Sequence, residues 1–235
     1  MVPNLQPFAF QSDDIEIVRL VDIGADTLDR VKVNDAADSV LGGGLVVGST
    51  YLIGGVPGAG KSTLILQWAI RCGVNALYAT AEETKEVLAE RADRVGTRVN
   101  TLSVVSSNDL ASVLERAGEF ELLVIDSINE MSFGDYSPGT NFHLVGCLHA
   151  ILEFQEANPN VTVIIVSHVN GDGEIAGPQT LKHGVKCVLH FVFDKQGNRV
   201  LFSSKNRHGP VGISVSYEMT EKGLIVVDKS EKDGV

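Results

Sequence analysis

The sequence predicts an α/β fold, in which helices flank a twisted, mostly parallel sheet and antiparallel strands follow at the C-terminal end. Apolar runs typical of buried strands alternate with segments of helical spacing between residues 50 and 166. A glycine-rich turn at 55–60 joins the first of these strands to the helix after it. From residue 185 onward, short strand-like runs are separated by tight turns, a pattern typical of antiparallel strands.

Length and composition fit one globular domain. The chain has 235 residues, of which 44% are hydrophobic and 21% charged, and these are ordinary values for a protein that buries a core. The 19 lysines and arginines against 30 acidic residues give a net charge of −11, which argues weakly against DNA binding. A local basic groove remains compatible with that charge.

The sequence carries no sign of secretion, a membrane span or a cysteine framework. Its N-terminus lacks a basic region followed by an apolar core, and no run of about 18 apolar residues occurs. We therefore expect a cytoplasmic protein without a membrane partner. Cys72, Cys147 and Cys187 lie far apart and form no C-x-x-C motif, so we expect reduced, buried thiols.

Residues 1–25 are predicted to form an N-terminal arm, and residues 26–235 a single domain. The first 14 residues hold two prolines and few periodic apolar positions, which fits either a flexible tail or a segment that docks on another subunit. Residues 15–21 are strand-like.

The elements of the domain follow in order along the chain. Apolar runs predict strands at 50–53, 76–80, 101–105, 122–125 and 161–166, and those at 50–53, 122–125 and 161–166 are expected to be buried. Helical spacing predicts helices at 35–41, 63–70, 83–95, 110–117 and 141–157. Shorter strands are predicted at 188–193, 200–203, 213–217 and 224–227. The segment 170–178 contains three glycines and is expected to be a mobile loop.

The turn after the first buried strand has the form G-x-x-x-x-G-K-S, which is the phosphate-binding P-loop. Its glycines let successive backbone N–H groups point at one anion, and the next helix adds the positive charge of its N-terminus. Lys61 is expected to reach the β- and γ-phosphates of ATP, and the Ser62 hydroxyl to bind Mg²⁺. The expected nucleotide-binding residues are Gly55, Val56, Pro57, Gly58, Ala59, Gly60, Lys61, Ser62 and Thr63.

Three carboxylates follow strands that end at the same edge of the predicted sheet. Asp126 ends the run 122–125, which is the Walker-B position for a side chain that orders Mg²⁺. Glu82 and Glu83 follow the strand 76–80, where a carboxylate would polarise the water that attacks the γ-phosphate. We predict Glu82 as the base and Glu83 as a helix cap, with the reverse assignment left open.

Other polar residues fit a role in ATP hydrolysis or a structural role equally well. His168 follows the strand 161–166 and would either contact the γ-phosphate or form a structural hydrogen bond. Lys205 and Arg207 are two cations one residue apart after a late strand. They would belong either to a solvated turn or to the ATP site of a neighbouring subunit, where cations stabilise transition-state charge.

Together these motifs resemble the ATPase core of the bacterial RadA/Sms DNA-repair proteins, within the RecA superfamily. The resemblance runs from about residue 33 to the C-terminus. The P-loop and Asp126 are shared across the superfamily, whereas the Ile-Ala-Gly-Pro segment at 175–178 and the Lys-Asn-Arg-x-Gly motif at 205–209 are specific to the family.

The resemblance implies a RecA-like fold and a homo-oligomeric ring, expected to be hexameric, with ATP between subunits. It implies a helicase-like motor that acts on single-stranded DNA in recombination, repair and branch migration, with a recombinase among its expected partners. By motif position, Glu82 becomes the catalytic glutamate and His168 the γ-phosphate sensor. Lys205 and Arg207 become the residues that act on the neighbour's nucleotide.

The sequence departs from the family pattern mainly where DNA would bind. We expect it to contain neither the four-cysteine zinc finger nor the Lon-like domain of the family. Asn170 and Gly171 stand where the family usually has Thr-Lys, so a channel cation is missing. Lys182 and Lys186 stand where it has acidic residues, and they would either supply that charge near DNA or be solvated. A KaiC-like regulatory or assembly switch and a mediator that loads a recombinase therefore remain alternatives.

Overall fold

The computed structural model describes residues 18–22, 24, 28–96, 98–134, 140–170 and 175–227, so most of the predicted arm lies outside the described part. The first described element is a short 3-10 helix, η1 (Leu20–Asp22). The prediction of a strand at 15–21 is therefore wrong over its described residues. Arg19 and Asp22 form an ion pair across this turn, which favours the helical conformation over an extended one.

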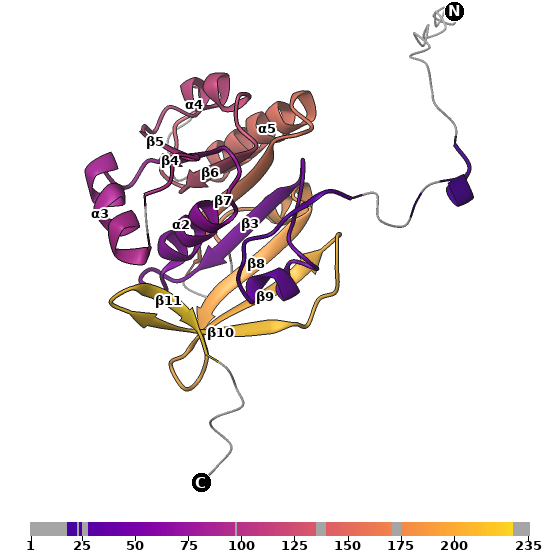
Figure 1. Cartoon of the computed structure of the whole chain (residues 1–235). Coiled ribbons are helices and arrows are strands. Elements are labelled where there is room, and N and C mark those ends of the chain that lie inside the picture. Colours follow the sequence, from indigo (N-terminus) through magenta and orange to yellow (C-terminus); the bar gives the residue numbers. More distant parts are fainter. Residues whose placement is uncertain are drawn as a thin grey trace, which may run out of the picture.

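The sheet consists of parallel strands followed by antiparallel ones. The parallel strands are β3 (Thr50–Gly55), β4 (Ala76–Thr80), β5 (Leu102–Ser106), β6 (Leu122–Asp126), β7 (Thr162–His168) and β8 (Cys187–Phe193). The antiparallel strands are β9 (Arg199–Asn206), β10 (Ser214–Thr220) and β11 (Gly223–Val226). Their order in space is β11-β10-β9-β8-β3-β7-β6-β4-β5 (Figure 1). The predicted fold class is confirmed.

Helices cover both faces of this sheet. Buried side chains of α1 (Ala37–Val40), α2 (Lys61–Arg71) and α3 (Lys85–Val95) belong to one apolar cluster. Those of α4 (Leu110–Ala117), α5 (Asn141–Ala157) and α6 (Gln179–Gly184) belong to the cluster on the other face. In the described residues no helix has the length and hydrophobicity to cross a membrane.

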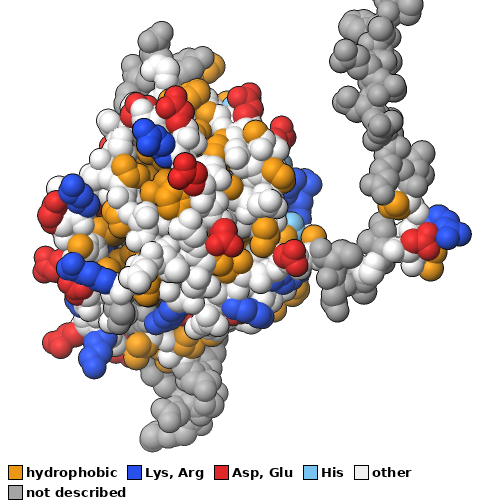
Figure 2. Space-filling view, turned by 45° about the horizontal axis from the view of Figure 1, so that its top comes forward, with side chains coloured by type: hydrophobic (Ala, Val, Ile, Leu, Met, Phe, Trp, Pro, Cys, Tyr) orange, Lys and Arg blue, Asp and Glu red, His pale blue; other side chains and the backbone are white. Residues whose placement is uncertain are grey.

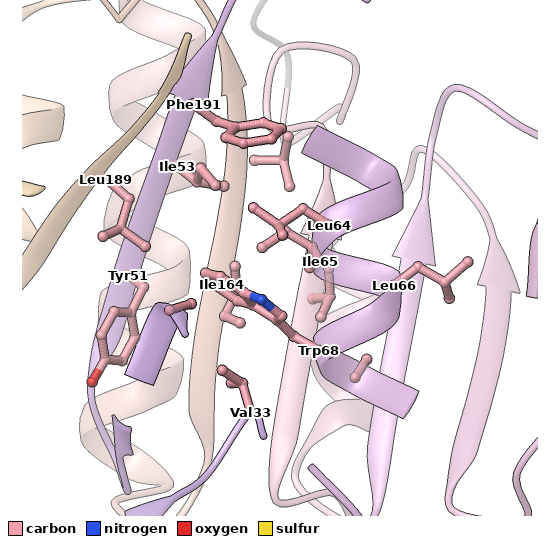
Figure 3. Close-up of a cluster of buried hydrophobic side chains, with 14 of the residues drawn as sticks. Val33, Tyr51, Ile53, Leu64, Ile65, Leu66, Trp68, Ile164, Leu189 and Phe191 are labelled. Atoms are coloured by element: carbon pink, nitrogen blue, oxygen red, sulfur yellow. The ribbon is translucent and has the colours of Figure 1, made fainter. Parts of the chain in front are cut away.

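The central strand β3 shows how the two clusters are separated. All six of its residues are buried, as expected for a parallel strand between two helical layers. Tyr51 and Ile53 join the cluster under α2, whereas Leu52 joins the opposite one, because successive side chains of a strand alternate between faces. Trp68 of α2 is fully buried in the same apolar cluster as Tyr51 and Phe191 of β8 (Figure 3).

Three small elements were not predicted from the sequence. β1 (Arg30–Val31) and β2 (Leu45–Val46) pair antiparallel and pack the chain before β3 against the body. The helix α6 follows Pro178 and has only six residues, which is less than two helical turns and too short to show a repeat of apolar positions. Of the three cysteines, which are all free, Cys147 and Cys187 are buried and Cys72 is half-buried.

The parallel strands place their ends at two opposite edges of the sheet. β3, β4, β6 and β7 end together in Gly55, Thr80, Asp126 and His168, and we call this side the carboxyl edge. The side where the same strands begin is called the amino edge. Every carboxylate predicted to act on ATP follows or ends a strand at the carboxyl edge.

Candidate nucleotide-binding and active site

The P-loop connects β3 to α2 as the sequence predicts. Gly55 is the last residue of β3 and Lys61 the first of α2. Gly60 precedes the helix with a φ of 98°, which is a left-handed conformation that favours glycine. At Gly55 a Cβ atom would lie 2.0 Å from the carbonyl oxygen of Phe191, so only glycine lets the loop approach β8.

Lys61 is buried and lies over this turn. Its Nζ donates hydrogen bonds to the carbonyl oxygens of Gly55 at 2.7 Å and Val56 at 3.3 Å. Burial lowers the pKa of its ammonium group, and the charges of Asp126 and Glu82 oppose that shift. The ammonium group therefore lies where the loop would hold an anion and close to two carboxylates.

Asp126 ends β6 and is almost fully buried. The hydroxyl of Tyr78, from the middle of β4, donates to its Oδ2 at 2.5 Å. Burial raises the pKa of this carboxyl, while hydrogen bonds from Tyr78 and Ser62 lower it. The hydroxyl of Ser62 and the carboxylate of Asp126 are hard oxygen donors, and one carboxylate beside phosphate oxygens and waters is the usual protein share of a Mg²⁺ site. The donor set therefore fits Mg²⁺.

Glu82 lies across the carboxyl edge from Lys61 and is held by two side chains. Its Oε1 accepts a hydrogen bond from the Ser127 hydroxyl at 2.6 Å and lies 3.0 Å from Nε2 of His168. These contacts hold the pKa of Glu82 at about 2, with the hydrogen bond from His168 as the largest cause. The same hydrogen bond raises the pKa of His168.

The backbone of His168 is fixed by a separate contact. Oδ1 of Asn129 accepts the backbone N–H of His168 at 3.0 Å and the hydroxyl of Ser167 at 3.2 Å. The imidazole therefore projects from a backbone that is held in place at the end of β7, and it forms a hydrogen bond with Glu82.

Glu83 bonds to a different partner from Glu82. It forms an ion pair with Arg91 of α3. The predicted helix cap at Glu83 is wrong, because Thr84 caps α3 by accepting a hydrogen bond from the backbone N–H of Val87. A hydroxyl bonds the exposed N–H groups of a first turn directly, and Thr84 is one residue closer to that turn. This geometry separates the two glutamates and favours Glu82 as the base.

A single cavity of about 410 Å³ collects the predicted residues of the carboxyl edge. Its wall combines the P-loop, the carboxylates and His168 with two residues that spacing did not indicate, Arg91 and Met219. The lining residues are Pro57, Gly58, Gly60, Lys61, Ser62, Thr63, Glu82, Arg91, Asp126, His168 and Met219. Val56 and Ala59 belong to the same loop, in which Ala59 is fully buried.

Lys205 and Arg207 lie elsewhere. The backbone N–H of Arg207 donates to Lys186, and that of Lys186 donates to Thr50, so Arg207 is level with the start of β3. Gly55 lies five residues further along that strand, about 16 Å away at roughly 3.3 Å per residue. Both cations are therefore near the amino edge, and the pocket of their own chain lies at the carboxyl edge.

The residues proposed for DNA contact are only partly described. Gly171 lies outside the described residues. Asn170 lies two residues after His168, the last residue of β7, and Lys182 lies on α6. Lys186 precedes β8 and is exposed beside Arg207. The three described residues are not among those that line the cavity at the carboxyl edge.

Sequence reasoning missed Tyr78 and Ser127, which hold the two key carboxylates. The signal for Tyr78 was a hydroxyl inside a strand otherwise made of small and apolar residues, next to the strand of Asp126. The hydroxyl of Ser127 directly follows that aspartate and is fully buried. Sequence spacing predicts neither contact. Tyr78 of β4 and Val124 of β6 pair in the sheet although they are 46 residues apart in the sequence.

Comparisons with known proteins indicate the type of domain. Residues 34–107 match a family model described as the KaiC ATPase. DNA repair protein RadA of Rickettsia bellii is 38% identical over 218 residues, which cover 87% of this chain and 48% of the relative. DNA repair protein RadA of Escherichia coli is 36% identical over 229 residues, which cover 94% of this chain and 50% of the relative. A RadA-family ATPase core fits this chain.

The RadA-like core spans about half the length of the curated relatives that it matches. A crystal structure of a KaiC-like protein from the archaeon Pyrococcus horikoshii superposes with a TM-score of 0.72 at 20% identity, over 86% of this chain and 100% of that chain. That likeness confirms the RecA-like fold. The family model, the relatives and the fold together support a RecA-like ATPase domain of the RadA type. Such a domain binds nucleotide.

Proposed function

We propose that the chain is an ATP-hydrolysing, RadA-like motor that acts on single-stranded DNA in recombination, repair or branch migration. The observation that carries the proposal is the cavity at the carboxyl edge, where Lys61, Ser62, Glu82, Asp126 and His168 meet. The names of the relatives add DNA repair as the process. A role in DNA repair would also place the protein in the cytoplasm, and this location is part of the proposal.

Each group in the cavity would have one role in hydrolysis. The P-loop amides and Lys61 would bind the β- and γ-phosphates, and Ser62 and Asp126 would hold Mg²⁺. When bound, the ion would neutralise charge that develops on the phosphate oxygens. Tyr78 would orient Asp126 by its short hydrogen bond.

Glu82 would take the proton of the attacking water. With a pKa of about 2 it is ionised at neutral pH but a weak base while it accepts hydrogen bonds from Ser127 and His168. A γ-phosphate near His168 would compete for that imidazole and free one oxygen of Glu82. Hydrolysis would then depend on the arrival of the γ-phosphate, which is the behaviour expected of a sensor.

Assembly would complete the site. Arg207 is exposed near the amino edge of its own chain, so the nucleotide that it serves would belong to a neighbouring copy in a ring, expected to be hexameric. A recombinase remains a proposed partner.

The test is ATP hydrolysis with and without single-stranded DNA at low salt, where phosphate contacts are strongest. We expect stimulation by DNA. Arg207→Ala should lose activity and regain it when mixed with Lys61→Ala, since each variant supplies what the other lacks. Hydrolysis that no DNA stimulates would refute the DNA role, and absence of rescue would refute shared sites.

A KaiC-like regulatory or assembly switch is the second candidate. The match of residues 34–107 to the KaiC model and the net charge of −11 favour it. On the face shown in Figure 2, basic side chains are interspersed with acidic ones and form no continuous basic track. An ATP-dependent complex with a protein partner that is insensitive to DNA would support this candidate. A strand-displacement assay would separate a motor from a mediator that only loads a recombinase.

A further inference from the structure

Lys205 is bound within its own chain. Its Nζ donates three hydrogen bonds, to the carbonyl oxygens of Lys182 at 2.9 Å, His183 at 3.0 Å and Val185 at 2.7 Å. These carbonyls close the C-terminal end of α6 (Gln179–Gly184), where backbone carbonyls have no partner within the helix and a cation is favourable. An ammonium group has three N–H donors, and all three are used here.

Lys205 is also half-buried, and burial lowers the pKa of its ammonium group. To contact a neighbour's nucleotide it would have to leave three carbonyls at the end of α6 unpaired. Its observed contacts therefore make it a positioning residue for α6, the helix that follows the segment 170–178.

The Lys-Asn-Arg-x-Gly motif predicts Lys205 as the cation that acts together with Arg207. In the structure, Lys186 also lies directly beside Arg207. Cys187 pairs with Asn206 across β8 and β9, so Lys186 and Arg207 are the next pair and lie directly opposite each other. The backbone N–H of Arg207 donates to the carbonyl oxygen of Lys186 at 3.1 Å. In an antiparallel pair, side chains directly opposite each other project to the same face.

Both side chains of this pair are exposed, and within the described part of the chain neither has an ion-pair partner. Like charges directly opposite each other destabilise a strand pair. The same surroundings lower the pKa of His208, first by burial and then by the charges of Arg30, Lys186 and Arg207. An anion between the two cations would remove the repulsion.

We propose that Lys186 and Arg207 form the pair of cations that binds the triphosphate held by a neighbouring copy, and that Lys205 positions α6. This inference rests on the proposed function, because it deepens the part of it that concerns the shared site. It also moves Lys186 from the proposed DNA contacts to the nucleotide contacts.

The first experiment measures ATP hydrolysis without DNA for the full chain and four single variants. Lys186→Gln and Arg207→Gln should each lower kcat about tenfold or more, because each removes a cation from the developing charge. Lys195→Gln is the matched control, since it removes an exposed lysine at the other end of the β8–β9 pair and should retain the wild-type rate. Mixing either affected variant with Lys61→Ala should restore activity, whereas mixing the two with each other should not.

For the fourth variant, Lys205→Gln, the exchange rates of the backbone amide hydrogens of α6 are measured. Its α6 amides should exchange at least about tenfold faster than in the wild type, while those of Lys186→Gln and Arg207→Gln should not change. Unchanged exchange in Lys205→Gln would overturn the role given to Lys205.

The outcomes separate this inference from the proposed function. Wild-type protein that does not hydrolyse ATP would refute the proposed function itself. Active wild-type protein with an inactive Arg207→Gln and a fully active Lys186→Gln would overturn only the cation pair. If Lys186→Gln lost DNA stimulation alone, Lys186 would be a DNA contact and the inference would be wrong.

Discussion

The hydrogen bond between Glu82 and His168 predicts a specific dependence of stability on pH, which His168→Gln should abolish. Glutamine retains a hydrogen-bond donor but does not titrate between pH 4 and 9. The wild-type pKa of Glu82 is lowered and that of His168 raised. The glutamate therefore contributes stability above pH 4.5 that is lost as the pH falls toward 2. The histidine contributes stability below pH 6.5 that is lost as the pH rises through its folded pKa.

The structure sets the size of this effect. The pKa of Glu82 falls from 4.5 to about 2, and at about 1.4 kcal/mol per unit this gives a ceiling of about 3.5 kcal/mol. Ser127 accounts for part of the shift, and the side chains of His168 and Glu82 are 34% and 35% exposed, so solvent screens the pair. We expect about 1 kcal/mol of stabilisation from the ionised pair.

Urea unfolding at pH 5.5 and 8.5 measures this quantity. The difference in unfolding free energy between the wild type and His168→Gln should be largest at pH 5.5 and about 1 kcal/mol smaller at pH 8.5. Comparing the two proteins at each pH removes the titration of His208, which is present in both. Ser127→Ala is the control, because it removes a neutral donor and should leave the pH dependence between these values intact. A difference that is equal at both pH values would refute the ion pair.

Three further predictions concern the cavity and its loop. Lys61→Ala should abolish ATP binding in calorimetry and leave the circular dichroism spectrum unchanged, because the Nζ of Lys61 donates to carbonyls at the end of β3 and in the loop rather than packing in the core. Tyr78→Phe removes the hydrogen-bond donor of Asp126, so it should lower the rate of ATP hydrolysis about tenfold and raise the Mg²⁺ concentration that hydrolysis requires. It should also lower the free energy of unfolding, measured in urea, by about 1–2 kcal/mol. Gly55→Ala should destabilise by more than about 3 kcal/mol in thermal unfolding, because its Cβ would overlap Phe191, whereas Gly58→Ala faces open space and should cost about 1 kcal/mol.

Much of the fold followed from local patterns. Buried parallel strands are continuous apolar runs, and the helices at 110–117 and 141–157 match α4 and α5 residue for residue. The exceptions are short or depend on distant contacts. β1 and β2 have two residues each, too few for any period, and exist because they pair with each other. Residues 20–22 form a turn through a local ion pair, which their apolar composition hid.

The candidate site was predicted in its chemistry but not in its contacts. Motif spacing placed Lys61, Glu82, Asp126 and His168 at one edge, and the cavity contains all four. Spacing could not choose between Glu82 and Glu83, because adjacent residues point in different directions only once the turn after β4 is fixed. Thr80 fixes that turn, since its hydroxyl accepts the backbone N–H groups of both glutamates at 3.3 and 3.1 Å.

The cavity and the exposed cations lie at opposite edges of the sheet, and this limits how copies of the chain could assemble. One chain carries the phosphate-binding cavity at the carboxyl edge and the exposed pair Lys186 and Arg207 near the amino edge, about 16 Å apart along β3. A ring would place the amino edge of one copy against the carboxyl edge of the next, and such contacts between different surfaces repeat into a closed ring or an open filament. A two-fold dimer instead uses the same patch of both copies, so it would join the cations to the cavity only if that one patch contained both edges. A two-fold dimer whose full ATPase activity is unchanged by Arg207→Ala would therefore contradict both the shared site and the assignment of Arg207.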